Sequence, residues 1–407
     1  MTTNTFAKFL MAGVAIVSLS AVASAQTQTP ADGPQAAANG TVAPPAAAKA
    51  AAASANPAPP AGPYKSALPL ASQAEFQAGE KAAAASVMAG APGSSGDSGA
   101  EAAPMAYGTS TAPYTTKRVA VTTFGTSTTA ANTPVNSYPY RATGKLYFKE
   151  GSDTYVCTAS LVKKGVLVTA AHCVFNYGKG ASGWYSNWTW CPANVNSAGG
   201  AYGCYSGVQP RILTPYYNGT DVCTQSGVVC NNDIATIVLA PKGTVHAGTT
   251  VGFYNYGWNG YAYSTTAVLG GARAVQITQL GYPVAFDSGY QMERTDAVGW
   301  YYTSGNLRNT QIGSAQTGGS SGGPWIVNFG TNPVINTSQA SAGTQPIQSV
   351  VGVTSYGSTT VGYNRQGASY FGQNTAYPGA SATYGGYGAG NIGKLMQDTC
   401  TANPTAC

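Results

Sequence analysis

The placement of the cysteines restricts the fold of this 407-residue chain more than any other feature of its sequence. An even number of cysteines in an exported chain is typical of a disulfide framework. Their order suggests that sequence neighbours pair, but this number permits many other pairings. A zinc site is disfavoured because there is no Cys-x-x-Cys pair and there are only two histidines, so we expect no metal ion. The eight cysteines are Cys157, Cys173, Cys191, Cys204, Cys223, Cys230, Cys400 and Cys407.

The N-terminus has the pattern of an export signal. Lys8 precedes a mostly apolar stretch, Phe9 to Val22, and Ala23-Ser24-Ala25 fits a small-residue cleavage site. The stretch is short, contains two serines and lacks a basic flank, so we predict a cleaved signal peptide at residues 1–25 rather than an anchor. We therefore expect a secreted or periplasmic bacterial protein that does not contact the membrane after the signal is removed.

The segment from Gln26 to about Tyr114 is rich in alanine, proline, glycine and serine. Such residues offer little apolar surface, so burial cannot offset the entropy lost on ordering, and we expect this segment to be mostly disordered. A pro-segment and a plain linker would both have this composition. The dibasic pair Lys117-Arg118 at its end is a candidate processing site. We therefore divide the remaining chain into a leader, residues 26–118, and a folded domain, residues 119–407.

After the leader, short β-like runs alternate with turns of glycine, asparagine, serine and proline. Charged residues make up only 8% of the chain, which suits an all-β extracellular domain better than a helical cytosolic one. The spacing of the runs indicates barrels or a sandwich. Helices are expected only for one turn after Ala170 and at Asn391–Asp398. The predicted strands are Val119–Phe124, Thr143–Phe148, Tyr155–Val162, Val166–Thr169, Ile234–Leu239, Gln276–Tyr282, Trp325–Phe329 and Ser349–Thr354.

The positive charges do not form a binding surface for nucleic acid. The formal charge of +6 is spread along the chain, and the densest basic runs are the pairs Lys117-Arg118 and Lys163-Lys164. Nucleic-acid binding needs a clustered basic footprint, so we expect no nucleic-acid partner. We interpret the scattered charges as a solvated surface.

A histidine and an aspartate, in two separate segments, each lie at the boundary of a predicted strand. The run from Leu167 to Cys173 ends a predicted strand and begins a helical turn at His172. Histidine is the natural general base near neutral pH, although a structural histidine beside a disulfide would fit the segment equally well. Asp233 begins an alternating apolar strand, where a buried carboxylate can accept a hydrogen bond from an imidazole and fix its tautomer.

The other candidates for these two roles fit less well. Asp221, Asp287 and Asp296 could replace Asp233, but none of them begins a comparable strand. The second histidine, His246, matches no motif, and we interpret it as a loop residue.

A third segment, GGSSGGPW at residues 318–325, places Ser321 between glycines. Glycines let the backbone turn tightly and expose N–H groups. The N–H groups of Gly319 and Ser321 could form an oxyanion hole for developing negative charge. A plain glycine–serine turn would also have this sequence, so the segment alone is weak support for a catalytic role.

Taken in the order His, Asp, Ser, the three segments resemble the chymotrypsin-like serine peptidases. TAAHC at residues 169–173, DIA at 233–235 and SGGP at 321–324 match the family's histidine, aspartate and serine motifs. The spacing of Cys157 and Cys173 resembles the family disulfide that flanks the histidine. QITQLGYP, with Met292-Glu293 beyond it, is similar to the bacterial glutamyl-endopeptidase branch.

The resemblance covers residues 119–407 and implies an all-β fold of two perpendicular six-stranded antiparallel β-barrels with a short C-terminal helix. It implies a triad in the cleft between the barrels, with Ser321 as nucleophile, His172 as general base and Asp233 orienting the histidine. Gly319 and Ser321 would form the oxyanion hole. The expected partners are polypeptide substrates of a monomeric enzyme, and no cofactor is expected.

Several positions depart from the family pattern. Ser320 stands where members activated by a new N-terminus carry aspartate, so that ion-pair switch is not expected. Ala315 replaces the carboxylate of trypsin-like members, and Thr354 replaces the histidine of glutamate-specific relatives. Without either charge partner the pocket is predicted to be neutral, with cleavage after apolar or small residues. The predicted pocket residues are Ala315, Thr354, Ser355, Tyr356 and Gly357.

The sequence thus predicts a secreted serine endopeptidase made as a zymogen. The alternative is a catalytically inactive protease-fold protein used for binding or adhesion, since a fold does not determine a function. The complete set of triad residues and the intact glycine-rich segment around Ser321 weigh against this alternative.

Overall fold

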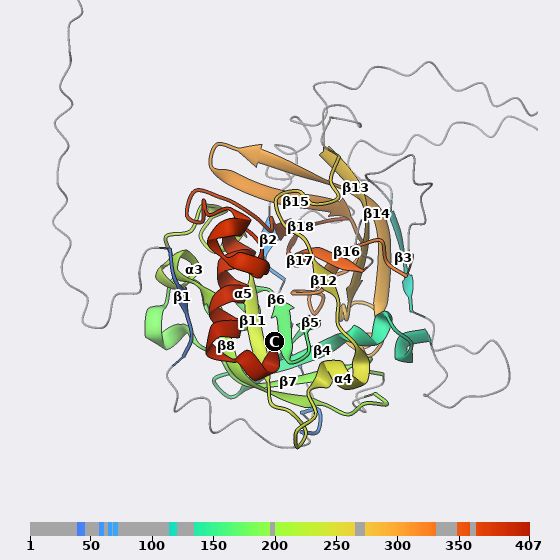
Figure 1. Cartoon of the computed structure of the whole chain (residues 1–407). Coiled ribbons are helices and arrows are strands. Elements are labelled where there is room, and N and C mark those ends of the chain that lie inside the picture. Colours follow the sequence, from blue (N-terminus) through green and yellow to red (C-terminus); the bar gives the residue numbers. More distant parts are fainter. Residues whose placement is uncertain are drawn as a thin grey trace, which may run out of the picture. The chain divides into compact units, whose positions relative to one another are not determined.

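Two antiparallel sheets, each closed on itself, make up most of the described structure (Figure 1). All described residues belong to one compact unit, Ala36–Cys407. The predicted signal peptide lies outside the described residues. The computed structural model describes residues 39–44, 57–60, 64–66, 68–71, 114–119, 134–195, 200–264, 273–330, 348–358 and 364–407.

The first barrel has six antiparallel strands in the order β8-β11-β6-β5-β4-β7, and it closes where β7 pairs with β8. Its β6 and β11, with the sequences VLVT and ATIVL, are buried throughout. β-branched residues such as these favour strands because they pack well on a pleated, buried surface. The strands are β4 (Thr143–Glu150), β5 (Asp153–Lys163), β6 (Val166–Thr169), β7 (Ser186–Pro192), β8 (Tyr205–Leu213) and β11 (Ala235–Leu239).

The second barrel also has six antiparallel strands, in the order β17-β16-β13-β14-β15-β18, and it closes where β17 pairs with β18. The predicted all-β fold of two six-stranded antiparallel barrels is therefore confirmed. The strands are β13 (Arg273–Gly281), β14 (Glu293–Ser304), β15 (Leu307–Gly313), β16 (Pro324–Val327), β17 (Ser349–Ser358) and β18 (Arg365–Ser369).

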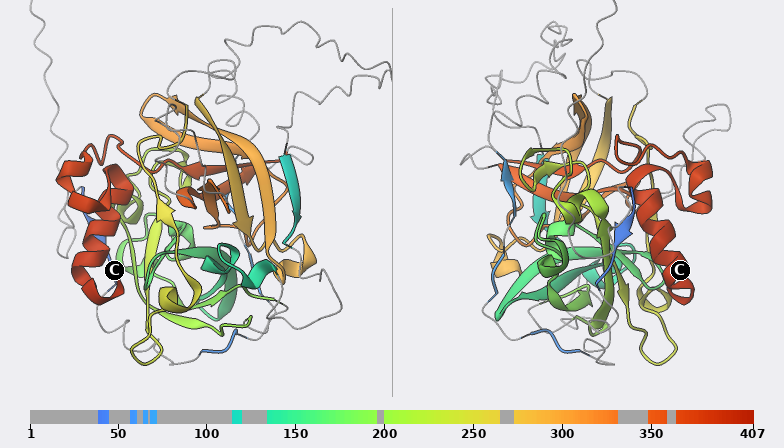
Figure 2. Two further views of the ribbon diagram at one scale, coloured as in Figure 1. Left: turned by 45° about the vertical axis from the view of Figure 1, so that its right-hand side comes forward. Right: turned by 90° about the vertical axis from the view of Figure 1, so that its left-hand side faces the viewer.

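The helix α5 (Gly390–Ala402) lies along the outside of the first barrel, against β8 and β11 (Figure 2). It buries Ile392, Leu395, Met396 and Thr399, whose spacing places them on one helix face. The helix predicted at Asn391–Asp398 is therefore confirmed and extends further at both ends. No helix among the described residues is long and apolar enough to cross a membrane.

Shorter elements connect the barrels and the helix. The turn predicted after Ala170 is the 3-10 helix η4 (Ala171–Cys173). The other short elements are the helices α3 (Thr214–Asn218) and α4 (Ala247–Val251), the strands β9 (Cys223–Gln225), β10 (Val228–Cys230) and β12 (Asn255–Tyr256), and the 3-10 turns η2 (Pro134–Asn136), η3 (Tyr140–Ala142), η5 (Gly180–Gly183), η6 (Asp287–Gly289), η7 (Ser381–Thr383), η8 (Gly385–Tyr387) and η9 (Pro404–Ala406).

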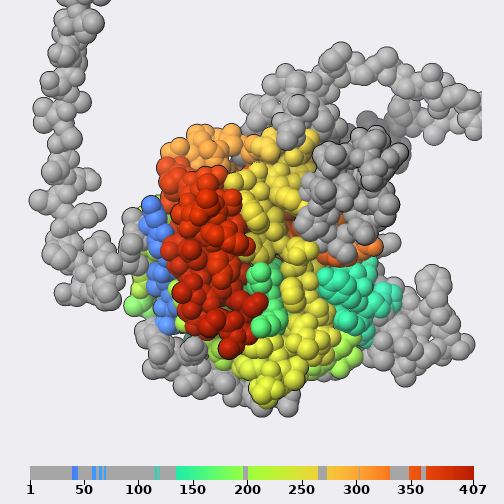
Figure 3. Space-filling view, viewed as in Figure 1, coloured from blue at the N-terminus to red at the C-terminus, as the bar shows by residue number. Residues whose placement is uncertain are grey.

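Three strands lie within the leader, where the sequence analysis expected mostly disorder. β1 (Thr41–Val42) pairs with β8, β2 (Leu70–Ala71) with β17, and β3 (Tyr114–Arg118) with β14. Figure 3 shows β1 in blue beside α5 in red, and Thr41 Oγ1 donates a 2.6 Å hydrogen bond to Asp398 Oδ2. These segments pair with strands that the barrels provide, which a composition argument does not detect.

The predicted strand Val119–Phe124 does not start at Val119. The strand ends at Arg118, and Val119 is buried outside it, with its N–H donating to the Met292 carbonyl at 2.8 Å. The remainder of the predicted strand Val119–Phe124 lies outside the described residues.

One large apolar core contains side chains from both barrels. Leu161 and Val168 of the first barrel belong to the same buried cluster as Leu280, Ile326 and Val353 of the second. The barrels therefore meet along a packed surface, and loops at this junction are held between two closed sheets.

Four disulfides close local loops among the described residues. The pairs are Cys157–Cys173, Cys191–Cys204, Cys223–Cys230 and Cys400–Cys407. The pairing of sequence neighbours suggested by the cysteine order is confirmed for all eight residues. Each link closes a short loop and lowers the entropy of the unfolded chain in the loop-closure description.

A matched pair of valines tests the core of the second barrel. Val327 is 1% exposed and Val298 is 40% exposed. Because the buried side chain leaves a cavity when truncated, Val327→Ala should lower the free energy of unfolding by about 2 kcal/mol. Val298→Ala should change it by less than about 0.5 kcal/mol. Chemical denaturation with the disulfides intact measures both, and equal effects would contradict the assignment of this core.

Candidate active site

His172 is presented by the η4 turn directly after β6. The disulfide between Cys173 and Cys157 fastens this turn to β5. The His172 side chain is 12% exposed, so most of the imidazole is held by the protein. The end of a strand and a covalent link thus fix the backbone on both sides of the ring.

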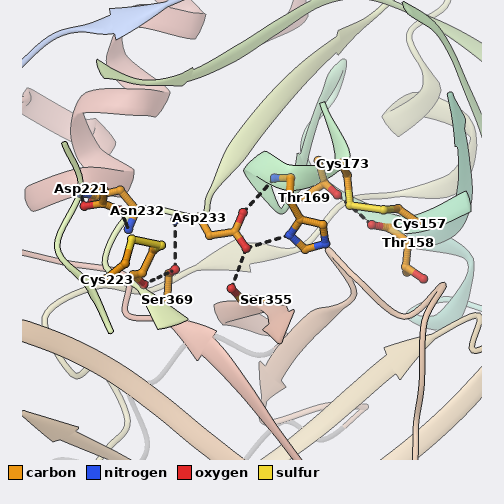
Figure 4. Close-up of polar contacts among 12 residues, drawn as sticks. Cys157, Thr158, Thr169, Cys173, Asp221, Cys223, Asn232, Asp233, Ser355 and Ser369 are labelled. Atoms are coloured by element: carbon orange, nitrogen blue, oxygen red, sulfur yellow. Dashed lines mark hydrogen bonds and ion pairs between the residues drawn. A yellow bond between two sulfur atoms is a disulfide. The ribbon is translucent and has the colours of Figure 1, made fainter. Parts of the chain in front are cut away.

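Asp233 lies in the chain between β10 and β11. It is fully buried, and its carboxylate points toward His172 (Figure 4). Its Oδ1 accepts the His172 backbone N–H at 2.9 Å, and its Oδ2 lies 2.8 Å from His172 Nδ1. Ser355 Oγ donates to the same Oδ2 at 2.6 Å. An ionised carboxylate in this place keeps the proton on Nδ1, so Nε2 carries the lone pair.

His172 Nε2 is the reactive end of this pair. It is buried and has no hydrogen-bond partner among the described residues. A buried polar atom without a partner is costly and commonly marks a place where function requires it. The arrangement therefore offers an oriented base whose acceptor nitrogen is not occupied by a structural contact.

The loop that carries Ser321 lies against the same part of the first barrel. The Ser321 carbonyl accepts the Thr158 N–H at 2.7 Å, and the Gly322 N–H donates to the Thr354 carbonyl at 2.7 Å. A Cβ on Gly322 would lie 1.9 Å from Thr169 Oγ1, and φ at this residue is +76°. Only glycine fits at position 322, because the loop lies very close to β6, the strand that precedes His172.

The predicted oxyanion donors lie in a tightly turned part of this loop. Gly319 has φ +98°, and its carbonyl accepts from Thr158 Oγ1 at 2.8 Å. The Gly318 carbonyl accepts from the Val284 N–H at 2.8 Å. Because the carbonyl and N–H of a trans peptide unit point in opposite directions, the Gly319 N–H points away from Val284.

The predicted pocket residues have different environments. Ser355 donates to Asp233, and the Tyr356 hydroxyl donates to Asn309 Oδ1 at 2.6 Å, so both side chains are engaged inside the protein. Ala315 is partly buried. Thr354 is fully buried, and its Oγ1 accepts from Gln279 Nε2 at 2.7 Å and from Trp325 Nε1 at 3.1 Å. The support that Ser355 gives to Asp233 was not predicted from the sequence.

A buried amide network surrounds Thr354 and was also missed. Gln279 Nε2 donates to Gln366 Oε1 as well, and Ser314 Oγ donates to Gln279 Oε1 at 2.7 Å. Gln366 Nε2 donates to the Gln316 carbonyl at 2.6 Å. The network contains no charged side chain, because glutamines and hydroxyls satisfy one another. Glutamines inside otherwise apolar strands were the signal available in the sequence.

Asp221 is a second carboxylate close to this site (Figure 4). It accepts the Asn232 N–H at 2.7 Å and Asn232 Nδ2 at 2.6 Å, and therefore holds the backbone next to Asp233. Part of the residue reaches solvent, but the protein surrounds the carboxyl group. Desolvation raises the pKa of Asp221 from 3.8 to about 7, against the lowering effect of the hydrogen bonds from Asn232 and Val222.

The other candidates from the sequence take different positions. Asp296 forms an ion pair with Arg294 at 2.8 Å. Asp287 lies in the turn η6, and His246 precedes the helix α4. Among the aspartates of the described residues, Asp233 is the one bonded to His172.

Two groups of three potential metal ligands occur among the described residues, and neither suits a metal ion. One contains Cys157, His172 and Cys173, and the other contains Asp221, Cys223 and Cys230. In both, the two cysteines are joined in a disulfide. Cysteine binds metals as a thiolate, so each group offers one ordinary ligand only.

Comparisons with known proteins find peptidases. No model of a known protein family matches the chain. An "Extracellular metalloprotease" of Bacillus subtilis (strain 168) is 35% identical over 122 residues, which is 30% of this chain and 34% of that protein. The chain therefore spans about a third of that relative's length.

Similar solved structures include three peptidases. A thermostable serine protease from an extremophilic microorganism has a TM-score of 0.43 at 22% identity, covering 57% of this chain and 92% of that one. Protease Anisep from Arthrobacter nicotinovorans has a TM-score of 0.42 at 24% identity, covering 58% and 95%. A Glu endopeptidase has a TM-score of 0.40 at 16% identity, covering 66% and 94%.

The raised pKa of Asp221 predicts a pH-dependent stability. The folded protein binds this proton more tightly than the unfolded chain, so the stabilisation is present below about pH 4 and is lost as pH rises through about 7. As the pH rises over this range, the unfolding free energy of Asp221→Asn should therefore increase relative to that of wild type. Urea denaturation measures both free energies. Asp287→Asn removes a carboxylate elsewhere and serves as the control. Parallel curves for wild type and Asp221→Asn would contradict the prediction.

Proposed function

We propose that this chain is an exported serine endopeptidase that hydrolyses peptide bonds with a Ser321–His172–Asp233 triad. One observation carries the proposal: a fully buried aspartate holds His172 through both its backbone N–H and Nδ1. This arrangement fixes the tautomer and leaves Nε2 as the base. The contact of the Ser321 carbonyl with Thr158 supports a position for the serine loop beside the histidine turn.

The proposed chemistry is acyl transfer. Nε2 of His172 takes the proton of Ser321 Oγ as this oxygen attacks the carbonyl carbon of the substrate. The N–H groups of Gly319 and Ser321 stabilise the negative charge that develops on the carbonyl oxygen. His172 then protonates the leaving amine, and water hydrolyses the acyl-enzyme with the same histidine as base. The Asp233 carboxylate stabilises the imidazolium that forms in each half-reaction.

The substrate pocket is proposed to be uncharged. Gln279 bonds to both Thr354 and Gln366, and the predicted pocket positions carry no ionisable group apart from the engaged Tyr356 hydroxyl. A charged substrate side chain would lose its hydration without gaining a counterion. Cleavage after apolar or small residues follows, and the resemblance to the glutamyl-endopeptidase branch would then concern the scaffold and not the specificity.

Export is proposed on two grounds. The N-terminal sequence has a signal-peptide pattern, and the folded part contains four disulfides, which form in oxidising compartments. Synthesis as a zymogen is part of the proposal, with the leader as the pro-segment.

Replacement of the nucleophile tests the triad. Ser321→Ala should lower peptide hydrolysis by about 10⁴-fold or more and remove labelling by a fluorophosphonate probe. Ser182→Ala is the matched control, because Ser182 lies in an exposed turn and donates only to the Lys179 carbonyl. Circular dichroism checks that both variants fold. Unchanged labelling of Ser321→Ala would refute the nucleophile, and absence of labelling in the processed wild type would favour a binding or adhesion protein.

Specificity is tested by digesting a peptide library and sequencing the products. Apolar and small residues should be enriched before the cut, because the pocket offers no counterion. The processed wild-type protein is the enzyme for this assay, with Ser321→Ala as the blank. Enrichment of glutamate, lysine or arginine before the cut would contradict a neutral pocket.

A further inference from the structure

A leader segment lies beside the loop that carries Ser321. We call residues 64–66 and 68–71 the strap. It enters beside the first barrel, where the Tyr64 ring packs on Tyr147 with centroids 5.2 Å apart. It leaves along the second barrel as β2, which pairs with β17 (Figure 1). The proposed catalytic chemistry does not require this segment, so its position needs another explanation.

The first anchor of the strap is at Lys65, on β5. The Lys65 N–H donates to the Thr154 carbonyl at 2.8 Å, and the Lys65 carbonyl accepts the Val156 N–H at 2.9 Å. Lys65 Nζ also forms a 2.6 Å ion pair with Asp153, although both side chains are about half exposed and the pair adds little. The backbone hydrogen bonds are therefore the main interactions that attach the strap to β5.

The second anchor is at Pro69, on β17. The Pro69 carbonyl accepts the Gly357 N–H at 2.8 Å. Leu70 and Ala71 then pair in parallel register with Gly357 and Ser358. The strap thus occupies backbone groups of a strand in the second barrel, as it does in the first.

The middle of the strap lies on the loop that carries the nucleophile. A Cβ built on Gly318 would be 3.0 Å from Ser66 Oγ and 3.5 Å from the Leu68 nitrogen. Leu68 is only 9% exposed, so its side chain is packed against the protein. Gly318 precedes Ser321 by three residues, so the strap passes next to the serine loop.

Both anchors lie two residues from contacts that build the site. Val156 is followed by Cys157 and then Thr158, whose N–H holds the Ser321 carbonyl. Gly357 follows Ser355, whose hydroxyl holds Asp233, by two residues. The strap therefore contacts the strand that holds the serine loop and the strand that carries Ser355, and its middle lies beside Gly318.

We propose that the strap is an intramolecular inhibitor that occupies the substrate groove and keeps the enzyme latent until it leaves. Extended peptides bind proteins by adding a strand to an exposed sheet edge. The edge N–H groups nearest the serine loop, on Val156 and Gly357, are already bonded to strap carbonyls. A substrate that needs these groups competes with the strap. The inference rests on the proposed function, because it assigns the strap to the same groove.

A first experiment tests docking without using activity. In full-length protein carrying Ser321→Ala, which prevents self-cleavage, hydrogen exchange should show the Gly357 amide protected by the Pro69 carbonyl. Leu68→Asp places a charge at a buried position and should speed exchange at Gly357 by about tenfold or more. The matched control Val245→Asp changes a 45% exposed residue and should not alter it. Equal exchange in all three proteins would overturn the docking of the strap.

A second experiment tests inhibition. Full-length Leu68→Asp, without the Ser321 substitution, should react with a fluorophosphonate probe about tenfold or more faster than full-length wild type, because the strap no longer blocks the groove. A synthetic peptide of residues 64–71, added in excess, should slow the reaction again. Leu68→Ala provides the same test if the charged variant does not fold.

The outcomes separate the two proposals. If processed wild type reacts quickly and full-length Leu68→Asp reacts as slowly as full-length wild type, the strap is not the inhibitor although the enzyme is active. Equal, fast reaction of full-length wild type and Leu68→Asp also overturns it. If no form reacts while hydrogen exchange shows the strap released, the proposed function itself fails.

Discussion

The candidate site depends on the hydrogen bonds that the buried carboxylate of Asp233 accepts. A charge with no exposed surface costs several kcal/mol unless donors surround it. The donors come from both barrels: His172 supplies two from the first, and Ser355 supplies one from β17 of the second. The Asp233 N–H donates to Ser369 Oγ of β18 at 3.0 Å. One residue therefore binds the two sheets together and sets the direction of the imidazole.

The serine loop is held by a second set of contacts across the same junction. Thr158 of β5 bonds the Ser321 and Gly319 carbonyls, and Thr354 of β17 exchanges backbone bonds with Gly322 and Gly323. The same two strands, β5 and β17, also carry the anchors of the strap. Holding the loop and accepting an extended segment are thus two uses of neighbouring backbone groups on the same two strands.

Seven barrel strands could be predicted because their runs are locally self-sufficient, whereas β7, β8, β14, β15 and β18 were not predicted. VLVT of β6 appears in the structure with the predicted bounds, and the other barrel strands that were predicted agree within a few residues. The leader strands could not be predicted, because two-residue strands such as β1 and β2 have no pattern of their own and form only where a barrel offers an edge. Ser355 was assigned to the pocket because sequence cannot show which way a side chain on a barrel strand points.

The sequence by itself suggested that neighbouring cysteines pair and predicted a β-rich fold of barrels or a sandwich, because both inferences depend on residue type and short spacing. The two-barrel fold and the proposed triad followed from the resemblance to a known family. The tertiary structure alone decided which donors surround Asp233, that uncharged amides surround Thr354, and that leader residues bond to β5 and β17. Those features join residues that are far apart in the sequence; Asp233 and Ser355, for example, are 122 positions apart. Contacts of this kind arise from the packing of one closed sheet on another, and no local pattern encodes them.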